Sequence, residues 1–170
     1  MSPRWTLTAV WIAGLAIAAV ATYLFSAAVD TYVTEHSPLS KIDFEYVPAP
    51  TTKESVQATI AAVLLPVGLI AAWVALFIRA RRSAGGWILL RALAALVPIA
   101  LAAFGLRGYF QVVVYTLCGD CGPPAPDNPA LDVFSRAGVV LSAAVPASVV
   151  VSLVLVVFAI VRFVRSRRPA

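Results

Sequence analysis

Acidic residues are missing from most of this chain, because all eight lie in two stretches, residues 30–54 and 120–132. Charged residues of both signs make up only 12% of the 170 residues, whereas a water-soluble domain carries about 25%. With 61% hydrophobic residues and a mean hydropathy of +0.92, the chain has more apolar surface than one aqueous core can bury. The sequence therefore predicts a membrane protein.

Several chemical signatures are also missing. The single histidine, His36, excludes a haem held by two histidines of this chain. No phosphate-binding glycine loop, H-E-x-x-H or G-x-S-x-G motif occurs. No carboxylate, lysine or histidine lies inside a long apolar run, although proton-coupled transporters use such groups. We predict no metal site, no cofactor and no catalytic residue, and we favour a non-enzymatic role.

Four apolar runs are long enough to cross a bilayer, because about 20 helical residues span its hydrocarbon core of about 30 Å. They are Trp5–Val29, Val56–Ile78, Trp87–Leu106 and Ala137–Val161. We predict an all-α, polytopic membrane protein: a single domain over residues 1–170 with four transmembrane helices in an antiparallel bundle. The predicted helices cover about residues 5–29, 52–80, 86–117 and 129–165, with outer loops at 30–51 and 118–128. The third helix exceeds the bilayer, so it and the fourth should form a hairpin that protrudes on the outer side.

Nine cationic residues lie at the same ends of these runs: Arg4, Arg79, Arg81, Arg82, Arg91, Arg162, Arg165, Arg167 and Arg168. By the positive-inside rule, both termini and the 79–86 connection are cytoplasmic, and the two acidic loops are outside. The first run is longer than the apolar core of a signal peptide, so we expect it to remain in place as a helix. Eleven arginines against two lysines, with Ala and Val dominant among the apolar residues, indicate a GC-rich bacterial genome. We therefore predict a multi-pass protein of the inner (plasma) membrane.

The charged residues at the two boundaries predict different partners. The net charge of +5 does not indicate nucleic-acid binding, because the basic residues are not clustered on one solvated face. We expect anionic lipid headgroups to bind the cytoplasmic arginines Arg79, Arg81, Arg82, Arg162, Arg165, Arg167 and Arg168. At the outer boundary we expect an interfacial belt of ion pairs made by Asp30, Glu54, Arg107 and Arg136. An anion or lipid-headgroup site is the alternative there.

Local signals place some helix ends and some helix contacts. Thr51 and Glu54 form a capping box, which predicts that the second helix begins at about Thr52. Asp127-Asn128-Pro129 supplies an N-cap and a first-turn proline for the fourth helix. Small residues recur at a spacing of four, which lets helix backbones approach closely; examples are Gly14–Ala18, Gly68–Ala72 and the row Ala144–Ser148–Ser152.

Each of the last three apolar runs contains one proline: Pro66, Pro98 and Pro146. A proline inside a helix removes a backbone donor, so we predict a kink at each position. Such kinks shape a bundle. The alternative is a hinge, or a site lined by the carbonyl groups that the prolines leave without a donor.

Cys118-Gly119-Asp120-Cys121 is the one local motif with reactive side chains, and it lies in an outer loop where thiols oxidise readily. We favour a structural disulfide between Cys118 and Cys121. No second cysteine pair exists to pass electrons on, and the only histidine lies on the other outer loop. A redox centre and a metal site remain as alternatives.

A C-x-x-C motif on a four-helix membrane bundle is similar in part to membrane thiol oxidoreductases of the vitamin K epoxide reductase and bacterial disulfide-generating types. The likeness covers Cys118, Cys121 and the number of helices. It implies a thiol–disulfide oxidoreductase acting outside the cytoplasm. Those enzymes use a second, shuttling cysteine pair, which this chain lacks, so we do not assign the chain to them.

The leading expectation for function is a non-catalytic integral membrane subunit that assists assembly or regulation of a larger complex. Its partner would be another membrane protein or an extracytoplasmic protein. A small transporter, channel or lipid-handling component is the first alternative, supported by the prolines and by the serine row on the fourth helix. A thiol–disulfide enzyme is the second, and an immunity or exclusion protein is the third.

Overall fold

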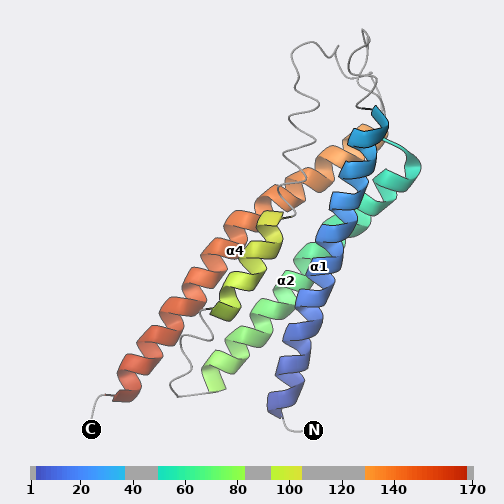
Figure 1. Ribbon diagram of the computed structural model, residues 1–170. Helices are drawn as coiled ribbons and strands as arrows, with labels where there is room; N and C mark the ends of the chain where they lie inside the picture. Colours follow the sequence, from blue (N-terminus) through green and yellow to red (C-terminus); the bar gives the residue numbers. More distant parts are fainter. Residues whose placement is uncertain (1–2, 37–49, 83–92, 105–128, 168–170) are drawn as a thin grey trace.

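The computed structural model describes residues 3–36, 50–82, 93–104 and 129–167, and these parts of the chain are helical with no strand (Figure 1). The long helices are α1 (Pro3–His36), α2 (Thr52–Arg82) and α4 (Pro129–Arg167). Each is long and apolar enough to cross a membrane. The prediction of an all-helical fold is therefore confirmed for these residues, and their three long helices are compatible with a membrane protein.

A shorter apolar helix, Leu93–Phe104, lies between α2 and α4 in the sequence. Its twelve residues rise about 18 Å, which is less than one crossing of the hydrocarbon core. The rest of the predicted third helix, residues 86–92 and 105–117, lies outside the described residues. Three candidate crossings are therefore described, and the fourth stays a prediction.

Helices α1 and α2 lie side by side and run in opposite directions (Figure 1). On each helix one row of buried residues recurs at alternating spacings of three and four, which is the pattern of a left-handed coiled pair. On α1 they are Gly14, Ala18, Ala21, Phe25, Ala28 and Tyr32, and on α2 they are Glu54, Ala58, Ala61, Leu65, Gly68, Ala72 and Ala75. We call these two rows the α1–α2 seam.

The α1–α2 seam is tightest at two glycines that face each other. A Cβ atom added to Gly14 would lie 2.6 Å from the carbonyl oxygen of Gly68 and 2.8 Å from the backbone nitrogen of Ala72. A Cβ atom added to Gly68 would lie 2.6 Å from the carbonyl oxygen of Gly14 and 2.7 Å from the nitrogen of Ala18. The small-residue pairs Gly14–Ala18 and Gly68–Ala72 therefore form one close contact between two backbones.

On its other side α2 packs against α4, and these two helices run in the same direction (Figure 1). The helix Leu93–Phe104 is tied to α4 by a hydrogen bond of 2.8 Å, in which the Ser152 hydroxyl donates to the carbonyl oxygen of Ala95. One apolar core joins the four helices and includes Phe25, Leu65, Ala102 and Leu141.

The capping box at the start of α2 is confirmed. The backbone N–H of Thr51 donates to Oε2 of Glu54 over 2.6 Å, and the N–H of Glu54 donates to the hydroxyl of Thr51 over 3.4 Å. Helix α2 begins at Thr52, and α4 begins at Pro129, the proline that follows the Asp127-Asn128 cap. Side-chain hydrogen bonds thus set the start of α2, whereas the predicted cap of α4 at residues 127–128 lies outside the described residues.

The end of α1 differs from the prediction. The helix continues to His36, whereas the charge pattern placed its end at Val29 and the beginning of the outer loop at Asp30. The first charged residue marks where the chain leaves lipid, but a helix bonds its own backbone and can continue into water. Residues 30–36 of the predicted outer loop at 30–51 therefore belong to α1, and residues 37–49 lie outside the described residues. The predicted loop at 118–128 lies outside the described residues.

Candidate functional site

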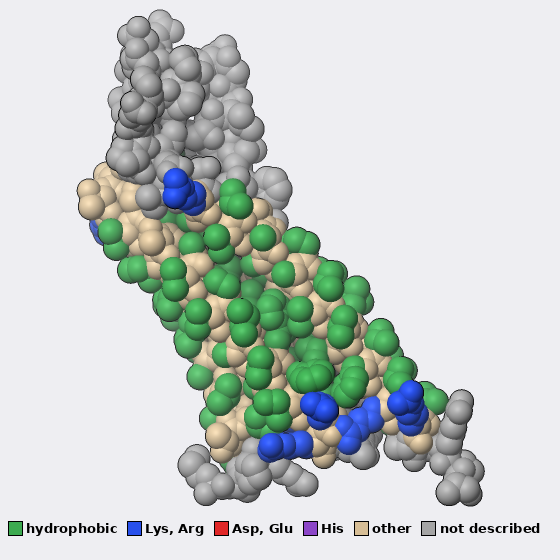
Figure 2. Space-filling view, turned by 180° about the vertical axis from the view of Figure 1, so that it is seen from behind, with side chains coloured by type: hydrophobic (Ala, Val, Ile, Leu, Met, Phe, Trp, Pro, Cys, Tyr) green, Lys and Arg blue, Asp and Glu red, His purple; other side chains and the backbone are tan. Residues whose placement is uncertain are grey.

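The described helices are apolar along their middles and charged at their ends. Between charged residues, α1 has 25 uncharged residues (5–29), α2 has 24 (55–78) and α4 has 25 (137–161). Each uncharged stretch is about 36 to 38 Å long. Figure 2 shows the apolar middle, with cationic side chains along the lower edge where α2 and α4 end. The three stretches match one another in length, as expected of helices that share one lipid layer.

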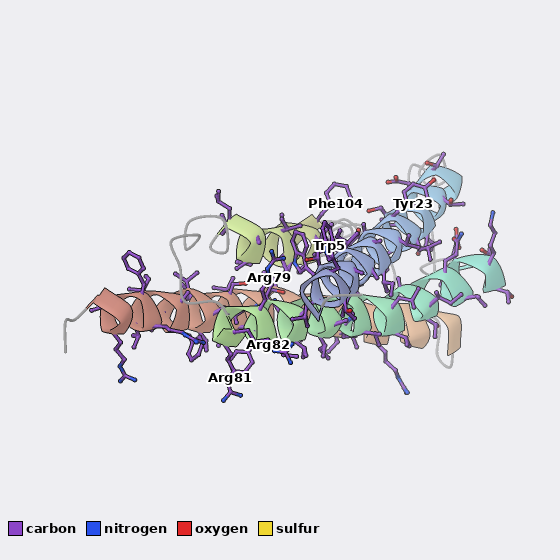
Figure 3. All side chains as sticks on the ribbon, turned by 90° about the horizontal axis from the view of Figure 1, so that it is seen from below. Trp5, Tyr23, Arg79, Arg81, Arg82 and Phe104 are labelled. Carbon is purple, nitrogen blue, oxygen red and sulfur yellow. The ribbon has the colours of Figure 1, made fainter. Side chains whose placement is uncertain are left out.

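Arg79 ties α2 to α1 at the arginine-rich end. Its Nη1 donates a hydrogen bond of 2.9 Å to the hydroxyl of Thr8, near the start of α1. Figure 3 shows Arg79 on the side of α2 that faces α1, whereas Arg81 points away from α1. Arg79 therefore has a helix-pairing contact that the other arginines of α2 do not share in this view.

Arg81 and Arg162 flank an aromatic pair between α2 and α4. The ring centroids of Phe77 and Phe158 are 5.5 Å apart. The guanidinium carbon of Arg81 lies 5.7 Å from the centroid of the Phe77 ring, which is within cation–π range. Nη1 of Arg162 donates a hydrogen bond of 3.1 Å to the carbonyl oxygen of Ala80. A contact within α2 thus positions Arg81, and a contact across the α2–α4 interface positions Arg162.

The opposite end of the bundle holds the described members of the predicted ion-pair belt. Asp30 and Arg136 are exposed, and Arg107 lies outside the described residues. Glu54 is fully buried, and its Oε2 is used in the capping box. Its Oε1 has no hydrogen-bond partner among the described residues. The one carboxylate contact described in this belt is therefore with the backbone of its own helix, and ion pairing stays a prediction.

Several hydroxyl groups within the uncharged stretches donate to backbone carbonyls, whereas the buried hydroxyl of Ser55 has no partner among the described residues. The Ser148 hydroxyl bonds to Ala144 over 2.6 Å within α4, and Ser152 bonds across to Ala95. Thr22 bonds to Ala19 over 2.8 Å. The serine row on α4 therefore has its hydroxyl protons committed to the helices themselves. The indole N–H groups of Trp11 and Trp73 are buried without an acceptor among the described residues.

The three prolines lie inside helices that continue past them. Pro66 is within α2 and Pro146 is within α4. Pro98 is buried inside the helix Leu93–Phe104. Pro98 removes the backbone donor that would bond the carbonyl of Ala94, and the Ser152 hydroxyl reaches the adjacent carbonyl, that of Ala95. The predicted kinks themselves are not tested by these observations.

Part of the predicted functional chemistry falls outside the described residues. This applies to Cys118 and Cys121, to the hairpin tip and to Arg168, and the side chain of Arg167 is likewise not described. Among the residues that the structure describes, no group of three His, Cys, Asp or Glu side chains could hold a metal ion.

The Phe77–Phe158 pair is the feature that sequence reasoning missed. A signal for it exists, because Phe77 precedes Arg81 by four residues and Phe158 precedes Arg162 by four. This Phe-x-x-x-Arg spacing places each arginine one turn beyond its phenylalanine on the same helix face.

Comparison of the chain with protein-family models, with curated proteins and with solved structures gives no match.

Proposed function

We propose that this chain is a multi-pass protein of a bacterial inner membrane and a non-catalytic subunit that assists the assembly or regulation of a larger membrane complex. In this proposal it crosses the bilayer four times, with both termini and the short 79–86 connection in the cytoplasm on the arginine-rich side. The acidic loops face outward and contact a membrane or extracytoplasmic partner.

The distribution of polar groups supports this proposal best. Over the described residues, every ionisable acidic or basic side chain lies at an end of the bundle. The hydroxyl groups of Ser148 and Ser152, the most inward polar groups of α4, donate to backbone carbonyls. A transport path or a reaction centre in the bilayer normally displays free polar or charged groups. The interior of these helices is instead built for packing.

The exposed surface also supports a partner in the membrane. Large apolar side chains are exposed along α4, including Val150 at 59%, Leu153 at 59% and Val157 at 57%. Lipid covers such a face when the protein is alone, and another transmembrane helix can cover it in a complex.

The proposal is tested by purifying the tagged full chain from its own membrane in a mild detergent, with native mass spectrometry of the eluate. We expect a second protein in a fixed ratio. Bulky substitution on the exposed α4 face, Val150→Trp with Val157→Trp, should reduce recovery of this partner if it docks there. The matched control is Val20→Trp on the exposed face of α1. A lone species of 17.9 kDa would contradict the proposal.

A further inference from the structure

The contacts at the arginine-rich end distinguish two arginines from the rest. Arg81 lies over the Phe77 ring of the Phe77–Phe158 pair, and Arg162 reaches from α4 to the Ala80 carbonyl of α2. Arg79 turns instead toward α1 and bonds Thr8. We propose that Arg81 and Arg162 form a binding site for the phosphate of an anionic phospholipid, which we call the α2–α4 phosphate site.

Parallel packing brings the two guanidinium groups to one level. Because α2 and α4 run in the same direction and their phenylalanines touch, the residue four positions beyond each phenylalanine lies one turn nearer the same end. Those residues are Arg81 and Arg162. Neighbouring helix axes lie about 8 to 10 Å apart, so a phosphate between the two helices is within reach of both flexible side chains.

No acidic side chain of the described residues can neutralise this pair. The described carboxylates, Asp30 and Glu54, lie at the opposite end of the bundle, and no acidic residue occurs between residues 55 and 119 or beyond residue 132. Two cations on adjacent helices repel each other without a counter-charge. A phosphate diester supplies that charge and accepts hydrogen bonds from the guanidinium groups.

The surface next to the arginines suits the rest of a phospholipid. Phe77 is 39% exposed, and Val74, which lies one turn before it on the same face of α2 as Arg81, is 50% exposed. These side chains lie on the bilayer side of the two arginines, where acyl chains would pack. A soluble phosphate would use the charges but not this apolar surface, so charge and hydrophobicity together favour a lipid as the occupant.

Two other arginines allow binding at this site to be distinguished from non-specific attraction of cations to an anionic membrane. Arg82 and Arg165 are exposed cations at the same end of the bundle. They offer a matched control, because the double variants R81Q/R162Q and R82Q/R165Q lose the same charge from the same two helices. Only the first pair removes the cations that border Phe77 and Phe158.

The test titrates the purified full chain in neutral detergent with phosphatidylglycerol, phosphatidylcholine or inorganic phosphate, and follows bound lipid by native mass spectrometry. At about 0.5 M salt, where charges separated by more than about 4 Å are screened, phosphatidylglycerol should still bind. We expect R81Q/R162Q to weaken this binding about 30-fold, based on about 1 kcal/mol for each cation. R82Q/R165Q should weaken it less than about threefold.

The single variant R81Q guards against loss of folding, because it keeps the Arg162 bond to the Ala80 carbonyl. It should weaken phosphatidylglycerol binding about fivefold, while thermal unfolding without lipid stays unchanged. Equal losses in both double variants, or equal binding of phosphatidylcholine, would overturn the site. Displacement of lipid by millimolar phosphate would overturn its assignment to a lipid. The α2–α4 phosphate site requires that the helices cross a bilayer, but it does not require the proposed accessory role. Failure to co-purify a partner protein would therefore not contradict this site.

Discussion

At the scale of single residues, Gly14 and Gly68 determine how close α1 and α2 can lie. Each glycine faces backbone atoms of the other helix at distances that no Cβ atom could tolerate. Dispersion between close backbones is a main source of helix association in lipid, where apolar burial gives no driving force. Because neither glycine has a side chain, the two backbones can touch at this point, and this close approach stabilises the α1–α2 pair.

We predict that Gly14→Ala and Gly68→Ala each destabilise the bundle by about 1 to 3 kcal/mol, because the added methyl group forces two rigid backbones apart. The free energy of unfolding in mild detergent, measured by titration with a denaturing detergent, checks this. Ala16→Val, which enlarges an exposed residue of α1, should change it by less than about 0.5 kcal/mol. Unchanged stability in both glycine variants would show that the helices do not meet here.

The residue scale also shows what spacing alone can reveal. Gly14–Ala18 and Gly68–Ala72 were recognisable as small-residue pairs, and the structure places them face to face. The same rule did not predict that Phe77 would pair with Phe158, because spacing within one helix does not specify the rotation of its neighbour. Contacts within a helix are readable from sequence, whereas contacts between helices need the packing.

At the scale of elements, the bond between Ser152 and Ala95 docks the short helix Leu93–Phe104 on α4. It is buried and joins residues 57 positions apart in sequence. A hydrogen bond between transmembrane helices contributes about 0.6 kcal/mol on average and at most about 1.7. Its particular use here is to satisfy a carbonyl close to the proline-disrupted part of the short helix.

We predict that Ser152→Ala destabilises the protein by about 0.5 to 1.5 kcal/mol, because the buried Ala95 carbonyl loses its cross-helix donor. Ser148→Ala is the control, because that hydroxyl bonds only within its own helix and its loss should cost less than about 0.5 kcal/mol. Thermal unfolding of the two variants in the same detergent separates these outcomes. Equal effects would argue that the serine row acts through packing alone.

Helix starts were predictable because a few residues determine each one. Thr51 and Glu54 exchange the two hydrogen bonds of a capping box, and Pro129 opens α4. The end of α1 at His36 was not predictable from the charge at Asp30, since the charge reports water and not the loss of helical backbone bonds. A charged residue indicates that the chain is exposed to water, whereas capping residues indicate where a helix begins or ends.

At the scale of the whole molecule, the arrangement of charge predicts orientation. Cationic residues gather at one end of α2 and α4, and the described carboxylates lie at the other end. In the predicted orientation, the charge-free stretches of about 36 Å lie in lipid and the arginines lie at its surface. Transfer of an arginine into the hydrocarbon core would cost several kcal/mol. The fourth crossing, predicted at Trp87–Leu106, includes residues outside the described ones and is based on its apolar composition.

We predict that Ser40→Cys reacts with a membrane-impermeant maleimide added to intact cells and that Ser83→Cys does not. Ser83 follows the last residue of α2 at the arginine-rich end, and Ser40 follows α1 at the opposite end. The variants should be made with Cys118→Ser and Cys121→Ser, so that only the introduced thiol can react. Labelling of Ser83→Cys alone from outside would invert the orientation.

The α1–α2 seam has a consequence for the order of events during synthesis. Its two helices are neighbours in the chain, and its closest contact does not involve α4. Because a ribosome produces the N-terminal part first, α1 and α2 can pair as a finished hairpin while α4 is still being translated. The later helices would then meet a preformed surface.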